Sequence, residues 1–136
     1  MLNFFLTHKR RAGQGGFTLI ELVVVLAILG ILLALAVPRY LGARKRAYKA
    51  EAQNLLQELK TLSWAYYQEF NVFRTDLSAL GFVMPNGASW DPPTGAGDNT
   101  QTVTWTLTGS SGTPVAGNTC SLILAGTGSS SQGCNF

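Results

Sequence analysis

Apolar residues are concentrated in one unbroken segment near the start of the chain. Residues 17–37 read FTLIELVVVLAILGILLALAV, and Glu21 is the only charged residue among these 21. An α-helix of that length spans about 31 Å, which is enough to cross the hydrocarbon core of a bilayer. The pattern therefore predicts a helix that serves as a membrane anchor or as an assembly element.

Beyond Pro38 the pattern becomes that of an amphipathic helix. Apolar residues recur at intervals of three and four positions, which places them along one helix face. They are Tyr48, Ala52, Leu55, Leu59, Leu62 and Tyr66, and the stripe continues toward Phe70 and Phe73. We therefore expect one long helix from residue 17 to about residue 70, interrupted locally near Pro38 and Gly42, whose second half packs against an apolar partner.

The C-terminal half has the composition and alternation of a small β-rich domain. Residues 102–108 alternate between threonines on a solvent-exposed face and apolar residues on the other face, namely Val103, Trp105 and Leu107. A second apolar run covers residues 120–125, and the Gly-, Ser- and Pro-containing segment 109–114 predicts a loop between two antiparallel strands. The expected fold class is α+β: a long N-terminal helix, apolar in its first half and amphipathic in its second, packed on a small antiparallel sheet.

The first 16 residues combine a basic cluster with a glycine-rich end. The cluster is His8, Lys9, Arg10 and Arg11, and Gly15 and Gly16 immediately precede the apolar segment. In a secretory signal peptide the small-residue cleavage site follows the apolar stretch instead. A cut after Gly16 would therefore leave the apolar segment on the mature chain.

Composition and charge limit the size of the fold and show where the charges lie along the chain. The chain has 136 residues, of which 46% are hydrophobic and 12% charged, so it can form one small domain with a real core. The formal net charge of +3 equals the charge of Lys9, Arg10 and Arg11. Beyond them the chain is balanced overall, with five basic residues in 39–49 and two basic against six acidic residues from residue 50 onward.

Residues 16–21, which read GFTLIE, closely resemble the processing site of type IV pilins and related pseudopilins. The resemblance extends through Pro38 into the amphipathic helix, whereas the C-terminal half matches only in general character. It implies that a prepilin peptidase cuts after Gly16 and N-methylates the new amino terminus at Phe17. The implied division of the chain is a cleaved leader at 1–16, a long helix at 17–72 with its transmembrane and assembly segment at 17–37, and a small globular β-rich head at 73–136.

Glu21 is the first candidate assembly residue. A carboxylate in a membrane helix costs on the order of 2 to 3 kcal/mol at the bilayer centre and less toward an end, so it needs a partner. Residues 17–37 contain no Lys or Arg, but cleavage would create an α-amino group at Phe17, one helical turn away. The two groups could pair within one chain or, as the resemblance implies, between neighbouring subunits. The alternative is an acid that is merely tolerated near the end of a signal anchor.

Gly30 and Pro38 are the other two candidate assembly residues. Pro38 removes the hydrogen bond to the carbonyl of Ala34, and Gly30 weakens the same stretch of helix. In the family that the sequence resembles, a locally melted segment between such a glycine and proline lets subunits extend within a filament. The alternative is an ordinary kink.

Cys120 and Cys134 enclose 13 residues rich in glycine and serine. A disulfide that closes a loop of this length stabilises a fold by roughly 3 kcal/mol in the chain-entropy model. We expect this disulfide because the loop is flexible and a membrane segment would deliver it to an oxidising compartment. Two unrelated buried thiols are the alternative.

A dense basic patch follows the apolar segment and is interleaved with Tyr40 and Tyr48. Its members are Arg39, Arg44, Lys45, Arg46 and Lys49. It suits anionic lipid at the membrane surface, and DNA phosphates are a less supported partner because no nucleic-acid-binding motif accompanies the charges. Counted by charge alone, the patch would place the C-terminus in the cytoplasm. The expected disulfide and the family's topology, which keeps the leader cytoplasmic, both favour the opposite orientation.

Other chemistry has little support in the sequence. Asp91, Asp98 and Asn99 could offer oxygen ligands to calcium, but they show neither an EF-hand spacing nor a rigid acid cluster. Without residues 1–16 the chain has no histidine, its thiols are expected to be paired, and its acids show no paired arrangement. We expect no enzymatic activity, no cofactor and no metal site.

The resemblance implies a structural subunit of a type IV pilus or pilus-like surface filament. Its partners would be other copies of itself in a helical homopolymer, the prepilin peptidase, the pilus assembly machinery and, before assembly, the bacterial inner membrane, with the head in the periplasm. The mature filament would be extracellular. Two alternatives stay open: a type II secretion or competence pseudopilin or minor pilin, and a membrane-anchored binding module that does not polymerise.

Overall fold

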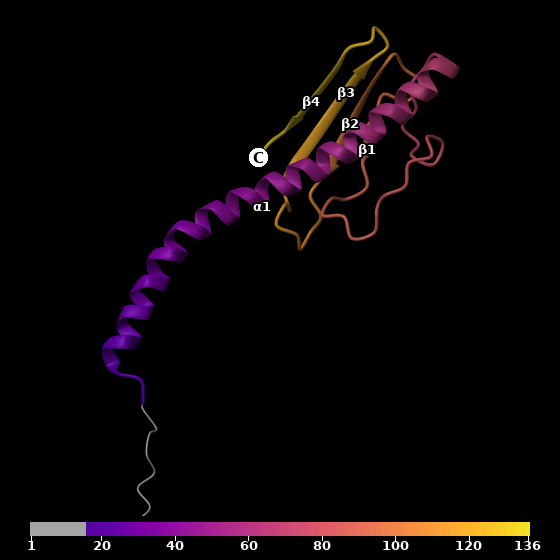
Figure 1. The fold of residues 1–136 in the computed structure, drawn as a ribbon. Coiled ribbons are helices and arrows are strands. Elements are labelled where there is room, and N and C mark those ends of the chain that lie inside the picture. The colour runs from indigo at the N-terminus through magenta and orange to yellow at the C-terminus, as the bar shows by residue number, and fades with distance from the viewer. Residues whose placement is uncertain (1–15) are drawn as a thin grey trace, which may run out of the picture. The chain divides into compact units, whose positions relative to one another are not determined.

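The computed structural model describes residues 16–136, so the predicted leader, apart from Gly16, lies outside the described residues. The described chain has one helix followed by four strands (Figure 1). They are α1 (Leu19–Phe70), β1 (Thr94–Ala96), β2 (Thr102–Thr108), β3 (Thr119–Ala125) and β4 (Ser130–Cys134). The chain divides into two compact units, one ending at Tyr40 and the other covering Leu41–Phe136. The prediction of a long helix packed on a small antiparallel sheet is confirmed.

Helix α1 is continuous over 52 residues, and the expected interruption near Pro38 and Gly42 is wrong. A proline removes only one backbone hydrogen bond, and residues with good helix propensity, such as alanine and leucine, allow the helix to continue through it. The helix ends where Asn71 adopts the left-handed conformation (φ 60°) and its backbone N–H donates to the carbonyl of Tyr67 at 2.7 Å. This is the usual way in which a helix satisfies one of its last carbonyl groups.

The four strands form one antiparallel sheet in the order β1-β2-β3-β4. The predicted pairing of residues 102–108 with the run at 120–125 is confirmed, with Trp105 opposite Leu122. Gly95 in β1 is needed where it stands, because a Cβ atom there would lie 2.8 Å from the Trp105 ring. The predicted alternation of β2 is also confirmed, since its apolar side chains are buried and its threonines are exposed or half-buried.

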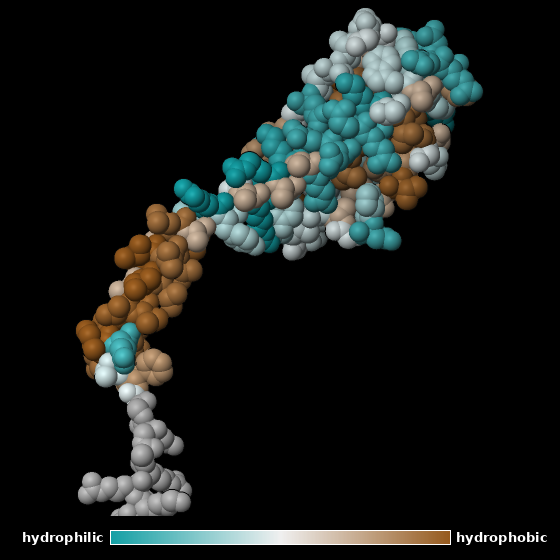
Figure 2. All heavy atoms as spheres, viewed as in Figure 1, coloured by the Kyte–Doolittle hydropathy of each residue, from teal (hydrophilic) through white to brown (hydrophobic). Residues whose placement is uncertain are grey.

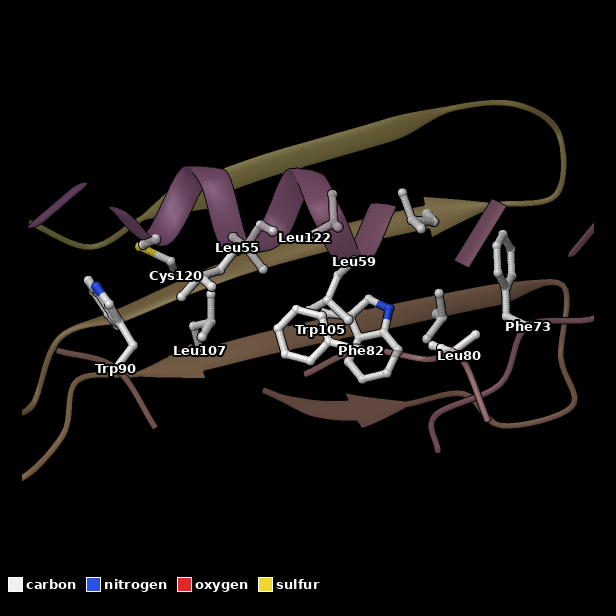
Figure 3. Close-up of a cluster of buried hydrophobic side chains, with 14 of the residues drawn as sticks. Leu55, Leu59, Phe73, Leu80, Phe82, Trp90, Trp105, Leu107, Cys120 and Leu122 are labelled. Carbon is white, nitrogen blue, oxygen red and sulfur yellow. The ribbon is translucent and has the colours of Figure 1, made fainter. Parts of the chain in front are cut away.

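The core lies between the sheet and one face of the second half of α1 (Figure 3). Leu55 and Leu59 of α1 face Trp105 and Leu122 in Figure 3, and all four side chains are buried. Three members of the predicted stripe, Tyr48, Leu62 and Tyr66, are only partly buried. Two residues outside the stripe are fully buried instead, Leu56 and Ser63. The buried face of α1 is therefore wider than the sequence pattern indicated.

The segment between α1 and β1 closes one side of this core. The side chains of Leu80 and Phe82, from this segment, are buried in the core. The turn before them is held by Asp76, whose carboxylate accepts hydrogen bonds from the Ser78 hydroxyl and from the backbone N–H groups of Ser78 and Ala79. These hydrogen bonds lower the pKa of the Asp76 carboxyl below its usual value, and the bond from the Ser78 hydroxyl has the largest effect.

Cys120 and Cys134 form a disulfide, as the sequence predicts. They stand opposite each other on β3 and β4, so the bond joins two paired strands of the sheet. The disulfide attaches β4 covalently to β3, and β4 itself has no buried residue.

Replacing both cysteines with serine is expected to lower the free energy of unfolding by about 3 kcal/mol, because the unfolded chain then regains the entropy of the open loop. Urea unfolding of the full-length protein in detergent, followed by circular dichroism, measures this change. Reduction of the wild-type protein should give the same shift in midpoint as the double substitution. An unchanged midpoint in both cases would show that the disulfide does not stabilise the sheet.

Candidate functional site

The first candidate site is the apolar first part of α1. Its large apolar side chains are all exposed within the described chain, with exposed fractions between 48% and 89%. Figure 2 shows this apolar surface in brown, with a teal hydrophilic group near its beginning. Helix α1 is long and apolar enough to cross a membrane by length and composition, and none of its most apolar window is buried. An apolar helix of this kind needs lipid or other protein chains around it.

The beginning of α1 is fixed by a reciprocal pair of hydrogen bonds between Thr18 and Glu21. The Glu21 carboxylate accepts from the Thr18 backbone N–H and from its hydroxyl, both at 2.8 Å, and the Glu21 backbone N–H donates to the Thr18 hydroxyl oxygen at 3.3 Å. This is a capping box, in which each side chain satisfies a backbone N–H that the helix leaves unpaired. We did not predict it, although the Thr-x-x-Glu spacing in the sequence signals it.

Phe17 and Glu21 lie together on the surface of this first turn. Both line a shallow apolar groove of about 330 Å³ that also includes Ile20, Val24 and Val25. In the uncleaved chain the nitrogen of Phe17 is part of the peptide bond to Gly16, so the charged α-amino group expected to pair with Glu21 does not exist before processing. The carboxylate is therefore next to the position where processing would create a positive charge.

Gly30 and Pro38 are both inside α1. A Cβ atom at Gly30 would meet no atom of the described chain within 4 Å, so packing inside the chain does not require a glycine there. A glycine in a helix interior costs up to about 1 kcal/mol relative to alanine. Open space at this position leaves room for a residue with a side chain, as far as the described chain is concerned.

The basic patch is partly engaged with aromatic rings. The Arg44 Nε–H donates to the Tyr48 hydroxyl at 3.2 Å, and the Arg44 guanidinium lies 5.7 Å from the centre of the same ring. The Lys45 ammonium lies 5.8 Å from the centre of the Phe136 ring. Such surface cation-π contacts contribute about 0.5 to 1 kcal/mol each.

The structure gives the three residues weighed as calcium ligands other partners. The Asp98 carboxylate accepts from the Thr75 backbone N–H at 3.0 Å and forms an ion pair with Arg74 at 3.7 Å. The Asp91 carboxylate accepts from the Ser110 hydroxyl at 2.6 Å, and the Asn99 side chain donates to Asp98. Within residues 16–136, no three His, Cys, Asp or Glu side chains are grouped so that they could hold a metal ion.

Comparison with known proteins relates the apolar segment to a known motif. Residues 11–37 match the family model described as the prokaryotic N-terminal methylation motif. The matched range contains Gly16, Phe17 and Glu21, together with the apolar segment up to Val37.

Three curated relatives carry related names. The type IV major pilin protein PilA of Myxococcus xanthus is 36% identical over 72 residues, which is 53% of this chain and 33% of PilA. The fimbrial protein EcpC of Eikenella corrodens is 43% identical over 70 residues, or 52% of this chain and 46% of EcpC. The type IV major pilin protein PilE of Neisseria gonorrhoeae is 41% identical over 68 residues, or 50% of this chain and 41% of PilE. The chain thus matches less than half the length of each of these relatives.

Proposed function

We propose that this chain is a member of the type IV pilin family and a structural subunit of a type IV pilus or pilus-like surface filament. The observation that carries the proposal is the methylation motif at residues 11–37, which coincides with an apolar helix that has no partner within the described chain. The role is structural rather than catalytic. A pseudopilin or minor pilin would share this N-terminal plan.

The apolar segment at 17–37 is proposed to hold the precursor in the inner membrane and then to form the core of the filament. Exchanging lipid for neighbouring helices gives little hydrophobic gain, so close packing and polar contacts must provide the specificity. Glu21 is the polar group available for this role. Gly30 leaves space for a neighbouring helix to approach, and the weakened hydrogen bonding at Pro38 allows the segment to adjust in length during assembly.

Processing is proposed to take place between Gly16 and Phe17. Gly16 and Phe17 precede the first residue of α1, and both are exposed. An extended, exposed glycine lets the peptide backbone enter a peptidase site without a side chain in the way. The leader at 1–16 would stay in the cytoplasm, where the peptidase acts, and the head at 73–136 would lie in the periplasm with the disulfide.

Mass spectrometry of the protein isolated from cells tests this proposal directly. We expect an amino terminus at Phe17 carrying one methyl group, because the family motif implies both cleavage after Gly16 and methylation. A Gly16→Leu variant should retain the leader, whereas a Gly15→Ala variant, altered one position earlier, should be processed. An intact leader or an unmethylated terminus elsewhere in the wild-type protein would favour the non-polymerising membrane module.

The amount of protein in sheared surface material separates the filament classes. Abundant polymer in the sheared fraction is expected for a major pilin. A processed and methylated protein confined to the cell envelope would instead support a pseudopilin or minor pilin.

A further inference from the structure

The unit formed by Leu41–Phe136 carries two grooves of opposite charge, each lined on one side by α1. The first, which we call the basic groove, has a volume of about 280 Å³. It is lined by Leu41, Arg44, Lys45, Tyr48, Pro114, Val115, Asn118 and Phe136. The second, which we call the acidic groove, has a volume of about 320 Å³ and is lined by Glu51, Asn54, Leu55, Glu58 and residues 85–88. The basic groove contains no acidic side chain, and the acidic groove contains no basic one.

Two charged side chains that line these grooves, Lys45 and Glu58, have no ion-pair partner in the part of the chain that the structure describes. The ion pair between Arg74 and Asp98 involves no residue that lines either groove. Within residues 16–136 the exposed Glu58 side chain makes neither an ion pair nor a hydrogen bond, whereas the Glu51 side chain accepts one hydrogen bond from the backbone N–H of Ser89 at 2.8 Å. Lys45 is exposed, and its ammonium group lies over the face of the Phe136 ring. At least one charge in each groove is therefore available to a partner.

We infer that the two grooves are the two sides of one head-to-tail interface, in which the basic groove of one copy of this chain meets the acidic groove of the next copy. The occupant is a second copy because the chain itself carries both complementary surfaces. An interface made of two different surfaces on each subunit leaves one of each free at the ends, so it generates an open helical polymer rather than a closed dimer. This inference deepens the proposed function and rests on it.

The helix sets the geometry of this contact. Lys45 and Glu58 are 13 positions apart on α1, which corresponds to about 20 Å along the helix axis. Two parallel copies staggered by about this distance therefore bring Lys45 of one copy level with Glu58 of the next. The exposed apolar residues of the two grooves, Leu41 and Pro114 on one side and Pro85 on the other, would then contribute packing around the charge pair.

The test is a charge exchange in the full-length protein expressed in cells. Lys45→Glu or Glu58→Lys alone should lower the amount of sheared filament about tenfold, because each places like charges opposite each other across the interface. The double variant should regain most of the wild-type amount. Arg46→Glu and Glu69→Lys are matched controls, since they change the net charge equally at exposed positions of α1 that line neither groove, and they should assemble normally.

Two results would overturn the inference. One is normal assembly of both single variants while the wild-type protein forms filaments. The other is a loss of DNA binding or of membrane attachment in Lys45→Glu with assembly unchanged, which would assign the basic groove to phosphate groups. If the wild-type protein forms no filament at all, the proposed function fails instead.

A covalent cross-link tests the stagger independently. A variant carrying both Lys45→Cys and Glu58→Cys should give a ladder of dimers, trimers and longer species after oxidation of intact filaments. The two positions of one chain are too far apart for an internal disulfide, which needs Cα atoms about 4.4 to 6.8 Å apart. Either substitution alone should give no ladder, and the absence of a ladder from the double variant in assembled filaments would contradict the proposed contact.

Discussion

Replacing Glu21 with alanine is expected to leave the subunit in the membrane and to abolish filament assembly. Removing the carboxylate lowers the cost of inserting the helix by up to about 2 to 3 kcal/mol, so the membrane-bound amount should not fall. Assembly should fail because the processed α-amino group at Phe17 loses the only acid in the apolar segment. The membrane fraction and the sheared fraction, measured side by side, give the two readouts. Normal filaments from this variant would remove Glu21 from the assembly residues.

The capping box provides a control that separates two roles of Glu21. The Glu21 carboxylate accepts the hydrogen bond from the Thr18 backbone N–H and also carries the negative charge. Glu21→Gln retains a side chain that can complete a capping box but has no charge, whereas Thr18→Ala removes the hydroxyl and keeps the charge. We expect Glu21→Gln to fail in assembly as Glu21→Ala does. We expect Thr18→Ala to assemble, at a cost of about 1 kcal/mol in helix stability. The reverse pattern would show that capping, not charge, is what assembly requires.

The sequence predicted the long elements well because each has a strong period. The spacing of three and four positions identified part of the buried face of α1, and the alternation of residues 102–108 identified β2 and its buried side chains. Strands β1 and β4 could not be predicted in this way. They read TGA and SSQGC, with no apolar alternation, and they are strands because they pair with β2 and β3.

The candidate sites differ in the same way, because some depend on neighbouring residues in the sequence and others on residues far apart in it. Gly16, Phe17 and Glu21 could be proposed from the sequence because the motif that suggests them lies within six consecutive residues. The two charged grooves could not, because each combines α1 with loop residues far away in the sequence, such as residues 85–88 and Pro114. Two features of α1 were not predicted correctly, although each has a signal in the local sequence. The Thr-x-x-Glu spacing at Thr18 was overlooked, and Pro38 was expected to interrupt a helix that is continuous through it.

Trp105 is the residue whose loss is expected to destabilise the head most. Its side chain is fully buried between α1 and the sheet, and its indole N–H donates to the hydroxyl of Ser63, which is also fully buried, at 3.1 Å. Trp105→Ala should lower the free energy of unfolding by about 3 to 5 kcal/mol, because it leaves a large cavity. Ser63→Ala, which only leaves the indole N–H unpaired, should cost about 1 to 3 kcal/mol.

Urea unfolding of the full-length protein in detergent, followed by circular dichroism, measures these losses against Ile123→Ala. Ile123 lies in the same sheet but is 45% exposed, so its truncation should shift the midpoint much less. A Trp105→Ala midpoint as high as that of Ile123→Ala would show that the core does not depend on this ring. The comparison also bears on assembly, because a loss of 3 to 5 kcal/mol is a large part of the roughly 5 to 15 kcal/mol that stabilises a small domain. Trp105→Ala should therefore lose filaments by losing folded subunits, whereas Glu21→Ala should lose them with the head intact.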